Sequence, residues 1–316
     1  IIRVRETGIC GSDLILYSDR TEPETYPGGH EVAGEIVDVG SNCDKKLIGQ
    51  RVAVDTVCQG LACRKCKYCE HHQYQHCEHP DQDEGGGFAQ YMKRRASGCY
   101  VVPDHVSWEE AALVEPFAVS IHAIRLSKMV RGDTVAILGA GNIGLTTIAA
   151  ARAMGAGNIL VTARHEHQKN LAKQLGADVT LDPSNPELLN EVLEITDGTG
   201  VDIAIETVGG RSNSIINEAI KMTCKQGRVV TLGYFPVPVT PDWVHLLVTE
   251  KTIVFSHCYS ATDGIHDYEI AIDLMSSGKV DLKQMVTHKY PLDQIQTAFK
   301  TAYNKQSGAI KVHISQ

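Results

Sequence analysis

Four cysteines at short intervals are the residues whose chemistry is easiest to recognise in this sequence: Cys63, Cys66, Cys69 and Cys77. The pattern C-x2-C-x2-C-x7-C lets one loop wrap a single ion, and structural Zn²⁺ sites take four ligands such as thiolates in tetrahedral geometry. Disulfide bonds are the alternative, but such tight spacing in a large chain favours metal. The sequence therefore predicts a structural zinc in a lobe at about residues 58–80.

A glycine-rich loop forms the second recognisable motif. Gly139, Gly141 and Gly144 follow the short apolar run Val135–Leu138 and open an apolar stretch of helical type. The first glycine allows a tight turn, the second lets the backbone approach a pyrophosphate, and the third lets helix pack on strand. A plain strand–helix turn is the alternative. We predict a dinucleotide site here, with Asn142 and Ile143 at the helix start facing the phosphates.

The next apolar strand ends in residues that discriminate between nicotinamide cofactors. An NAD site places Asp or Glu there to bond the ribose 2′-hydroxyl, whereas this sequence has Ala163-Arg164-His165. A guanidinium binds a 2′-phosphate that a carboxylate would repel, and His165 and Lys169 add positive charge. The sequence therefore favours NADP(H), the alternative being that Arg164 is solvated and NAD(H) binds without its usual partner.

A second set of possible metal ligands is dispersed along the chain. Cys10 lies in Gly-Ile-Cys-Gly-Ser-Asp, His30-Glu31 follow two glycines, and Glu115 lies in Leu-Val-Glu-Pro. Spacing rules cannot unite ligands so far apart. Taken singly, they are equally a buried thiol, a core histidine and carboxylates of structural roles, so the residue types alone leave this site open.

The elements that position these groups fall into three zones within 316 residues, a length typical of two domains. Residues 1–120 are β-rich, with expected strands at 35–39, 51–54 and 100–102. Residues 121–257 alternate apolar strands with helices, which is typical of a parallel sheet covered on both faces. Residues 258–316 show one helix (268–276) and one strand (309–314), too little for a core, so we assign them to the first domain. Ile1–Arg5 reads as the middle of a strand, and we expect residues to precede it.

Composition excludes several classes of function. The net charge of −8 with scattered Lys and Arg argues against nucleic-acid binding, and no apolar run approaches the length of a membrane helix. Ten cysteines placed at metal-ligand spacing or singly favour a reducing compartment, so we expect a cytoplasmic protein.

Taken together, the ordered motifs resemble the zinc-containing medium-chain dehydrogenase/reductase family along essentially the whole chain. The family's zinc signature reads here as Gly29-His30-Glu31, Gly34, Gly40 and Cys43, and the cysteine lobe and glycine loop follow in the family's order. The resemblance implies an α/β fold in which a GroES-like β-rich catalytic domain (1–120 and 258–316) accompanies a Rossmann doubly wound parallel-sheet domain (121–257). It also implies that Thr207, Val208, Leu232 and Gly233 lie at cofactor-binding strand ends.

The resemblance further implies a catalytic zinc, and so two zinc ions per chain. Cys10, His30, Glu31 and Glu115 would be an exchanging ligand set, as in the polyol, threonine and glucose dehydrogenase branch, with Ser12 as a proton-relay hydroxyl. Ile15 replaces a relay histidine found in many relatives, and the sequence after Phe255 lacks the polyol-binding Arg of sorbitol dehydrogenases.

The function expected from the resemblance is hydride transfer between a small secondary alcohol, polyol or sugar and NADP(H), in a homodimer or homotetramer that needs no nucleic acid or membrane. Two alternatives stay open: an NAD-dependent threonine- or glucose-dehydrogenase-like enzyme, and a non-catalytic protein that binds zinc and nucleotide.

Overall fold

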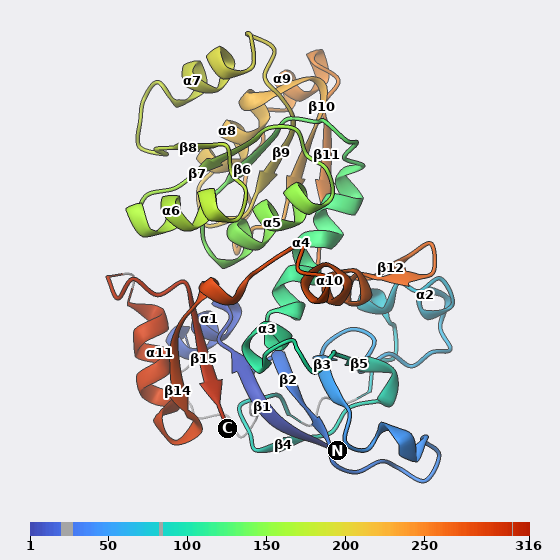
Figure 1. Ribbon diagram of the computed structural model, residues 1–316. Coiled ribbons are helices and arrows are strands. Elements are labelled where there is room, and N and C mark those ends of the chain that lie inside the picture. The colour runs from blue at the N-terminus through green and yellow to red at the C-terminus, as the bar shows by residue number, and fades with distance from the viewer. Residues whose placement is uncertain (20–27, 82–84, 305) are drawn as a thin grey trace. The chain divides into compact units, whose positions relative to one another are not determined.

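The computed structural model describes residues 1–19, 28–81, 85–304 and 306–316. These residues form two compact units, Ile1–Ala118 with Cys258–Gln316, and Val119–His257. The C-terminal segment thus shares a unit with the N-terminal residues (Figure 1). Among the described residues, no helix has both the length and the apolar character needed to cross a membrane.

The first unit is built on a seven-stranded sheet in which β14-β15-β1-β2-β3-β5 are neighbours and β4 also pairs with β1. Among the described strand pairs of this sheet, β14 and β15 run parallel and the others run antiparallel. Side chains such as Val4, Val32 and Val52 form its core. The strands are β1 (Ile2–Gly8), β2 (Glu31–Ile36), β3 (Arg51–Asp55), β4 (Tyr91–Met92), β5 (Cys99–Val101), β14 (Val286–Pro291) and β15 (Lys311–Ser315).

Two sequence-based expectations for this unit were wrong in detail. The strand expected at 35–39 is β2, which begins at Glu31 and contains Gly34. The sheet requires glycine at position 34, because a Cβ there would come 2.4 Å from the Arg3 carbonyl oxygen of β1. The C-terminal segment also contains a strand, β14, and a helix, Ile295–Tyr303, that we did not expect.

That helix, α11, packs on β14 and β15. The remaining helices and the small β12–β13 hairpin surround the sheet (Figure 1). They are α1 (Gly11–Asp19), α2 (Lys67–Glu70), α3 (Trp108–Ala112), the start of α4 (Val114–Ser127), β12 (Ala261–Thr262), β13 (Ile265–His266) and α10 (Asp267–Ser276), with 3₁₀ turns at Lys45–Leu47, Tyr74–His76, Ala96–Gly98, Lys283–Met285 and Leu292–Gln294.

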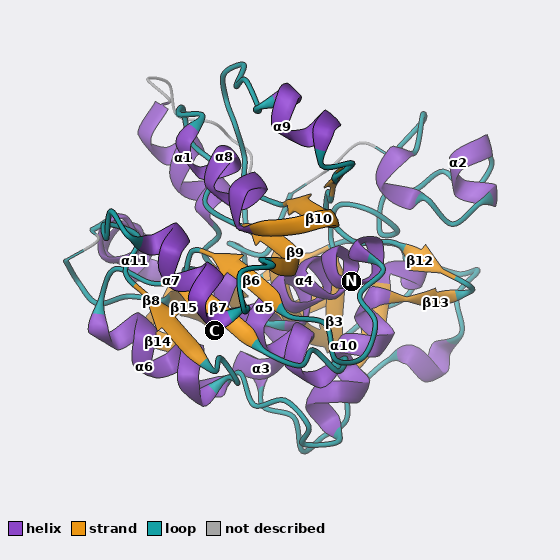
Figure 2. Ribbon diagram, turned by 90° about the horizontal axis from the view of Figure 1, so that it is seen from above, coloured by secondary structure: helices purple, strands orange, loops and turns teal. Residues whose placement is uncertain are grey.

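The second unit is a six-stranded parallel sheet in the order β11-β10-β9-β6-β7-β8. Figure 2 shows α5 and α6 on one face and α8 and α9 on the other. Its elements are β6 (Val135–Leu138), α5 (Asn142–Ala153), β7 (Ile159–Thr162), α6 (Glu166–Gln174), β8 (Val179–Leu181), α7 (Leu188–Ile195), β9 (Val201–Glu206), α8 (Ser214–Met222), β10 (Thr223–Thr231), α9 (Trp243–Val248) and β11 (Thr252–Phe255).

The strand order places the glycine-rich loop at the point where the direction of strand connection reverses. All four residues of β6 are buried, as expected for a central strand covered on both faces. The chain proceeds from β6 outward through β7 and β8, then returns to β9 on the other side of β6. Such a switch in direction beside the carboxyl end of β6 is where doubly wound sheets bind ligands. The predicted α/β fold class is confirmed.

Candidate metal and cofactor sites

The four spaced cysteines converge as their spacing predicts. The Sγ atoms of Cys63, Cys66, Cys69 and Cys77 all lie within 4.8 Å of one another. The backbone N–H groups of Cys63 and Lys65 point at sulfur atoms of the group, 3.3 and 3.4 Å away. Backbone N–H groups of Glu78 and Cys69 lower the pKa of Cys66 to about 6. Donors directed at sulfur favour the thiolate of Cys66, whereas burial raises the pKa of Cys69 to about 12. Four cysteine sulfur atoms at this spacing suit a closed zinc site, in which the metal would hold all four as thiolates.

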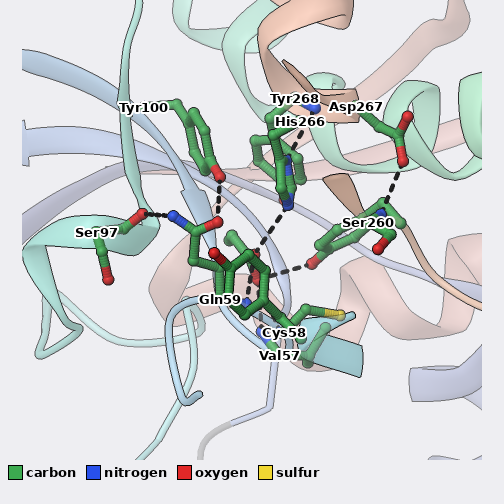
Figure 3. Close-up of polar contacts among 12 residues, drawn as sticks. Val57, Cys58, Gln59, Ser97, Tyr100, Ser260, His266, Asp267 and Tyr268 are labelled. Carbon is green, nitrogen blue, oxygen red and sulfur yellow. Dashed lines mark hydrogen bonds and ion pairs between the residues drawn. The ribbon is translucent and has the colours of Figure 1, made fainter. Parts of the chain in front are cut away.

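A buried carboxylate joins this lobe to the C-terminal segment of the same unit. Asp55, at the end of β3, accepts hydrogen bonds from the backbone N–H groups of Cys58 and Gln59 and from the Tyr259 hydroxyl. Gln59 in turn contacts Ser97 and Tyr100, as Figure 3 shows. Burial raises the pKa of Asp55 to about 6 although these donors oppose the shift.

The dispersed ligands also meet. One ligand atom from each of Cys10, His30 and Glu31 lies within 4.8 Å of the others. Cys10 lies two residues after the end of β1, and His30 immediately precedes Glu31 at the start of β2. Because β1 and β2 are adjacent antiparallel strands with Gly8 opposite Glu31, the end of one meets the beginning of the other. The pairing of β1 with β2 therefore brings together three residues that lie far apart in the sequence.

Charges within this cluster suit a cation. Burial raises the pKa of the Cys10 thiol, but a hydrogen bond from His30 and the charges of His30 and Lys311 bring it below its ordinary value. Burial lowers the pKa of His30, yet the same hydrogen bond and the charges of Cys10 and Glu115 raise it well above the usual range. A thiolate thus lies beside a ring that favours its protonated form, and Zn²⁺ would replace that proton because it binds thiolate and neutral imidazole.

Asp13, which the sequence analysis gave no role, orients this cluster. Its Oδ2 accepts a hydrogen bond from the Cys10 backbone N–H at 2.8 Å, and its Oδ1 lies 3.7 Å from His30 Nδ1. A carboxylate beside one ring nitrogen fixes the orientation of a metal-binding histidine. The signal was present, because Asp13 closes the Gly-Ile-Cys-Gly-Ser-Asp motif.

Lys311 is the second functional residue that sequence reasoning missed. Its Nζ lies 2.6 and 2.7 Å from the two carboxylate oxygens of Glu31, and both side chains are buried. The Glu31 carboxylate occupies the space beside Gly8. A Cβ at Gly8 would lie 1.9 Å from Glu31 Oε2. A lysine 280 residues away gives no sequence signal that connects it with Glu31.

Glu115 and Ser12 lie apart from this three-residue group. Glu115 is buried in the first turn of α4, and burial raises its pKa well above the ordinary value, with His30 opposing the shift and Glu31 and Cys10 adding to it. It is close enough to sense these charges but lies outside the 4.8 Å group. Ser12 is exposed at the second position of α1.

The glycine loop has the geometry of a phosphate cradle. Gly139 has φ +103°, and a Cβ at Gly144 would lie 1.9 Å from the Gly139 carbonyl oxygen. Around Gly141 there is open space for a Cβ. No side chain caps the start of α5 at Asn142, within the described residues, and Asn142 Oδ1 is buried without a partner there. Ile143 follows in the same first turn, so uncapped N–H groups face the loop.

The end of β7 presents cationic and ring groups to solvent. Ala163 is buried, whereas Arg164, His165 and His167 are exposed. The rings of His165 and His167 stack with centroids 5.5 Å apart. Lys169 Nζ lies 2.9 Å from Glu166 Oε1, so its charge is partly compensated.

The ends of β9 and β10 carry the other predicted cofactor residues. Thr207 Oγ1 donates to the Leu138 carbonyl oxygen at 2.8 Å, which ties its strand end to the glycine loop. Val208 is exposed, and Leu232 and Gly233 are partly buried. Buried Glu206 accepts hydrogen bonds from the backbone N–H groups of Val208 and Gly209 at 2.6 Å. These strand ends border the switch point beside β6.

Comparison with known proteins gives the family. Residues 1–104 match the model "Alcohol dehydrogenase GroES-like domain", and residues 142–277 match "Zinc-binding dehydrogenase". A sorbitol dehydrogenase of Bacillus subtilis is 34% identical, with 99% of this chain and 89% of that protein covered. A D-arabitol-phosphate dehydrogenase of Enterococcus avium is 35% identical, with 95% and 85% covered.

Solved structures of dehydrogenases have the same fold as this chain. An Escherichia coli oxidoreductase/dehydrogenase of unknown specificity superposes with a TM-score of 0.89 at 32% identity, covering 99% of this chain and 90% of that one. A zinc-binding dehydrogenase from Sinorhizobium meliloti bound to NADP gives 0.87 at 27%, with 100% and 91% covered. An E. coli dehydrogenase complexed with NADH also gives 0.87, at 26% with the same coverage. The chain therefore belongs to the zinc-containing medium-chain dehydrogenase/reductase family and is an oxidoreductase of its alcohol and polyol dehydrogenase type.

Proposed function

We propose that this protein transfers a hydride between a secondary alcohol, polyol or sugar and NADP(H). The single observation that carries the cofactor choice is the end of β7, where Arg164 is exposed and no carboxylate occupies the strand end. A guanidinium offers paired donors to a 2′-phosphate, and the neighbouring His165–His167 stack adds two further nitrogen-bearing rings. The pyrophosphate would lie at the uncapped start of α5.

The metal ligands in this proposal are Cys10, His30 and one carboxylate. Lys311 holds both oxygens of Glu31, so that carboxylate already has a cationic partner. Glu115 makes no ion pair within the described residues, and its raised pKa reports a buried carboxyl group short of positive charge. We therefore assign Glu115 as the resting ligand and Glu31 as the carboxylate that exchanges with it. The soft thiolate, imidazole and carboxylate donors fit zinc, and the Cys63–Cys77 group fits a second, structural zinc.

Zinc at this site would act as a Lewis acid on the substrate oxygen. The chain's own residues supply the rest. Asp13 keeps the His30 ring and the Cys10 backbone in place. The Ser12 hydroxyl, two residues after Cys10 and exposed, would exchange a proton between the substrate oxygen and water. Ile15 cannot extend that relay, so the proton would pass from Ser12 directly to solvent.

The test of the cofactor assignment is kcat/KM for NADPH and NADH with a panel of ketones, in the wild-type protein and in Arg164→Asp. We expect a preference for NADPH in the wild type and a loss of about 10- to 100-fold in kcat/KM for NADPH in the variant, the worth of one charge-assisted contact. Lys173→Gln, an exposed change in α6, is the control. A strong wild-type preference for NADH would contradict the assignment.

A further inference from the structure

A second buried ion pair lies behind the Lys311–Glu31 pair. His313 Nδ1 is 3.1 Å from Glu6 Oε1, and the Ser315 hydroxyl donates to the same oxygen at 3.0 Å. His313 is completely buried and Glu6 is 3% exposed. Neither residue belongs to a motif that the sequence analysis singled out, and neither is part of the ligand set proposed above.

The sheet register places both pairs on one face. Gly8 of β1 lies opposite Glu31 of β2 on one side and opposite His313 of β15 on the other, and Glu6 lies opposite Ser315. Residues two apart on a strand share a face, so Glu6 and Gly8 line up with Lys311, His313 and Ser315 across the neighbouring strand. Since Gly8 has no side chain, the Glu31 carboxylate crosses this row to reach Lys311.

Acidic and basic side chains alternate along the row. Glu6 faces His313, and Lys311 faces Glu31, which in turn lies in the group with Cys10 and His30. Burial raises the pKa of Glu31, but Lys311 and His30, and to a smaller extent His313, bring it below its ordinary value. In a buried environment such charges interact more strongly than at the surface, because water screens them less.

Glu6 fixes the imidazole in this row. A carboxylate only accepts hydrogen bonds when ionised, so His313 donates through Nδ1. Its Nε2 is buried and has no hydrogen-bond partner within the part of the chain described. The ring orientation therefore depends on the contact with Glu6, which Ser315 holds from the other side.

Resting on the metal site proposed above, we propose that the Glu6–His313 pair, which shares a sheet face with the Lys311–Glu31 pair, sets the affinity of the Cys10–His30 site for Zn²⁺ through the charge that it places beside Glu31. Groups behind metal ligands orient them and tune the charge that the ion meets. Loss of the Glu6 carboxylate removes a negative charge from the sheet face behind the ligands, which disfavours a divalent cation.

The experiment measures zinc dissociation constants of the whole chain by competition with a chromophoric chelator. We expect Glu6→Gln to weaken zinc at the Cys10–His30 site by about 10-fold, the lower end of the range for groups in direct contact with metal ligands, because Glu6 acts on the site through its charge. Zinc at the Cys63–Cys77 site should be unchanged. The matched control is Glu35→Gln in β2, which removes an equal charge from the partly exposed Arg5–Glu35 pair, and it should change neither constant by more than about twofold.

A second variant, with a smaller change, tests the inference if Glu6→Gln does not fold. Ser315→Ala removes one donor to Glu6 and should weaken the same site in the same direction, by about 2- to 10-fold, the worth of one hydrogen bond. Unchanged zinc affinity in folded Glu6→Gln, or in Ser315→Ala where Glu6→Gln does not fold, would overturn the inference. A wild-type chain that binds a single zinc, lost in Cys69→Ser, would instead overturn the proposed function.

Discussion

The two cysteine-containing clusters of the first unit form in different ways. Cys63, Cys66, Cys69 and Cys77 come from one short loop, and their sulfur atoms converge through local turns. Cys10, His30 and Glu31 lie at or just beyond the ends of two neighbouring strands, and a lysine from a third strand completes the charge arrangement. A local cluster can be recognised by spacing, whereas a dispersed one depends on sheet register. The first suits a structural ion and the second a reactive one.

The largest effect should follow from disrupting the local cluster. Cys69→Ser removes one of four ligands, and structural zinc in isolated finger peptides contributes on the order of 10 kcal/mol to folding. We expect loss of one zinc per chain, rapid proteolysis of the lobe around residues 58–80, and a clear fall in thermal midpoint. Limited proteolysis with zinc analysis measures this. A lobe that stays protected without zinc would show that the metal does not order it.

The dispersed cluster should respond in activity rather than in stability. Cys10→Ser is expected to lower turnover by about 10⁴-fold, or roughly 5 kcal/mol in activation free energy, because the Lewis acid is lost. The free energy of unfolding should change by about 1 kcal/mol or less. Steady-state kinetics and chemical denaturation provide the two readouts. A variant that is fully active removes Cys10 from the proposed ligand set.

The Lys311–Glu31 pair lies beside the dispersed cluster, yet we expect it to contribute to the free energy of unfolding. Lys311→Met leaves the Glu31 carboxylate buried without its cation, which costs about 3–5 kcal/mol. The exposed Lys289→Met, which breaks the ion pair with Glu109, is the control and should cost about 1 kcal/mol or less. Equal destabilisation of the two variants would mean that Glu31 does not need Lys311.

The smallest expected effect concerns Asp55, which connects the lobe to the rest of its unit. Its pKa in the folded protein is about 6 against an ordinary value of 3.8, so the folded state binds the proton more tightly than the unfolded state does. Its contribution to stability therefore increases as pH falls from about 7 to about 4, by about 2 kcal/mol. Comparing unfolding free energies of the wild type and Asp55→Asn across this range isolates it. A constant difference between the two would contradict the raised pKa.

Much of the fold was predictable because its signals are local. The strand Val135–Leu138 and the strand Val179–Leu181 have the expected bounds, and Gly139 and Gly144 lie where a phosphate-binding turn requires glycine. Helix α11 was missed although Ile295, Ala298, Phe299 and Ala302 repeat at helical spacing, which is a signal that closer attention to period would have found.

The candidate site was predictable only in part. The ligand types could be named from motifs, but the contacts of Glu31 with Lys311 and of Glu6 with His313 span 280 and 307 residues. Such pairs depend on which strands become neighbours, and strand pairing is a property of the whole sheet. The cofactor preference and the ligand roles stay predictions that the variants above can test.

The most direct test of the central claim is a titration of activity against zinc content. Protein stripped by a chelator and then given increasing Zn²⁺ should regain the lobe's protease resistance with one bound zinc and turnover with another, and the second ion should be absent from Cys10→Ser. A protein that oxidises NADPH with a ketone at its normal rate while the Cys10–His30 site holds no metal would contradict the account.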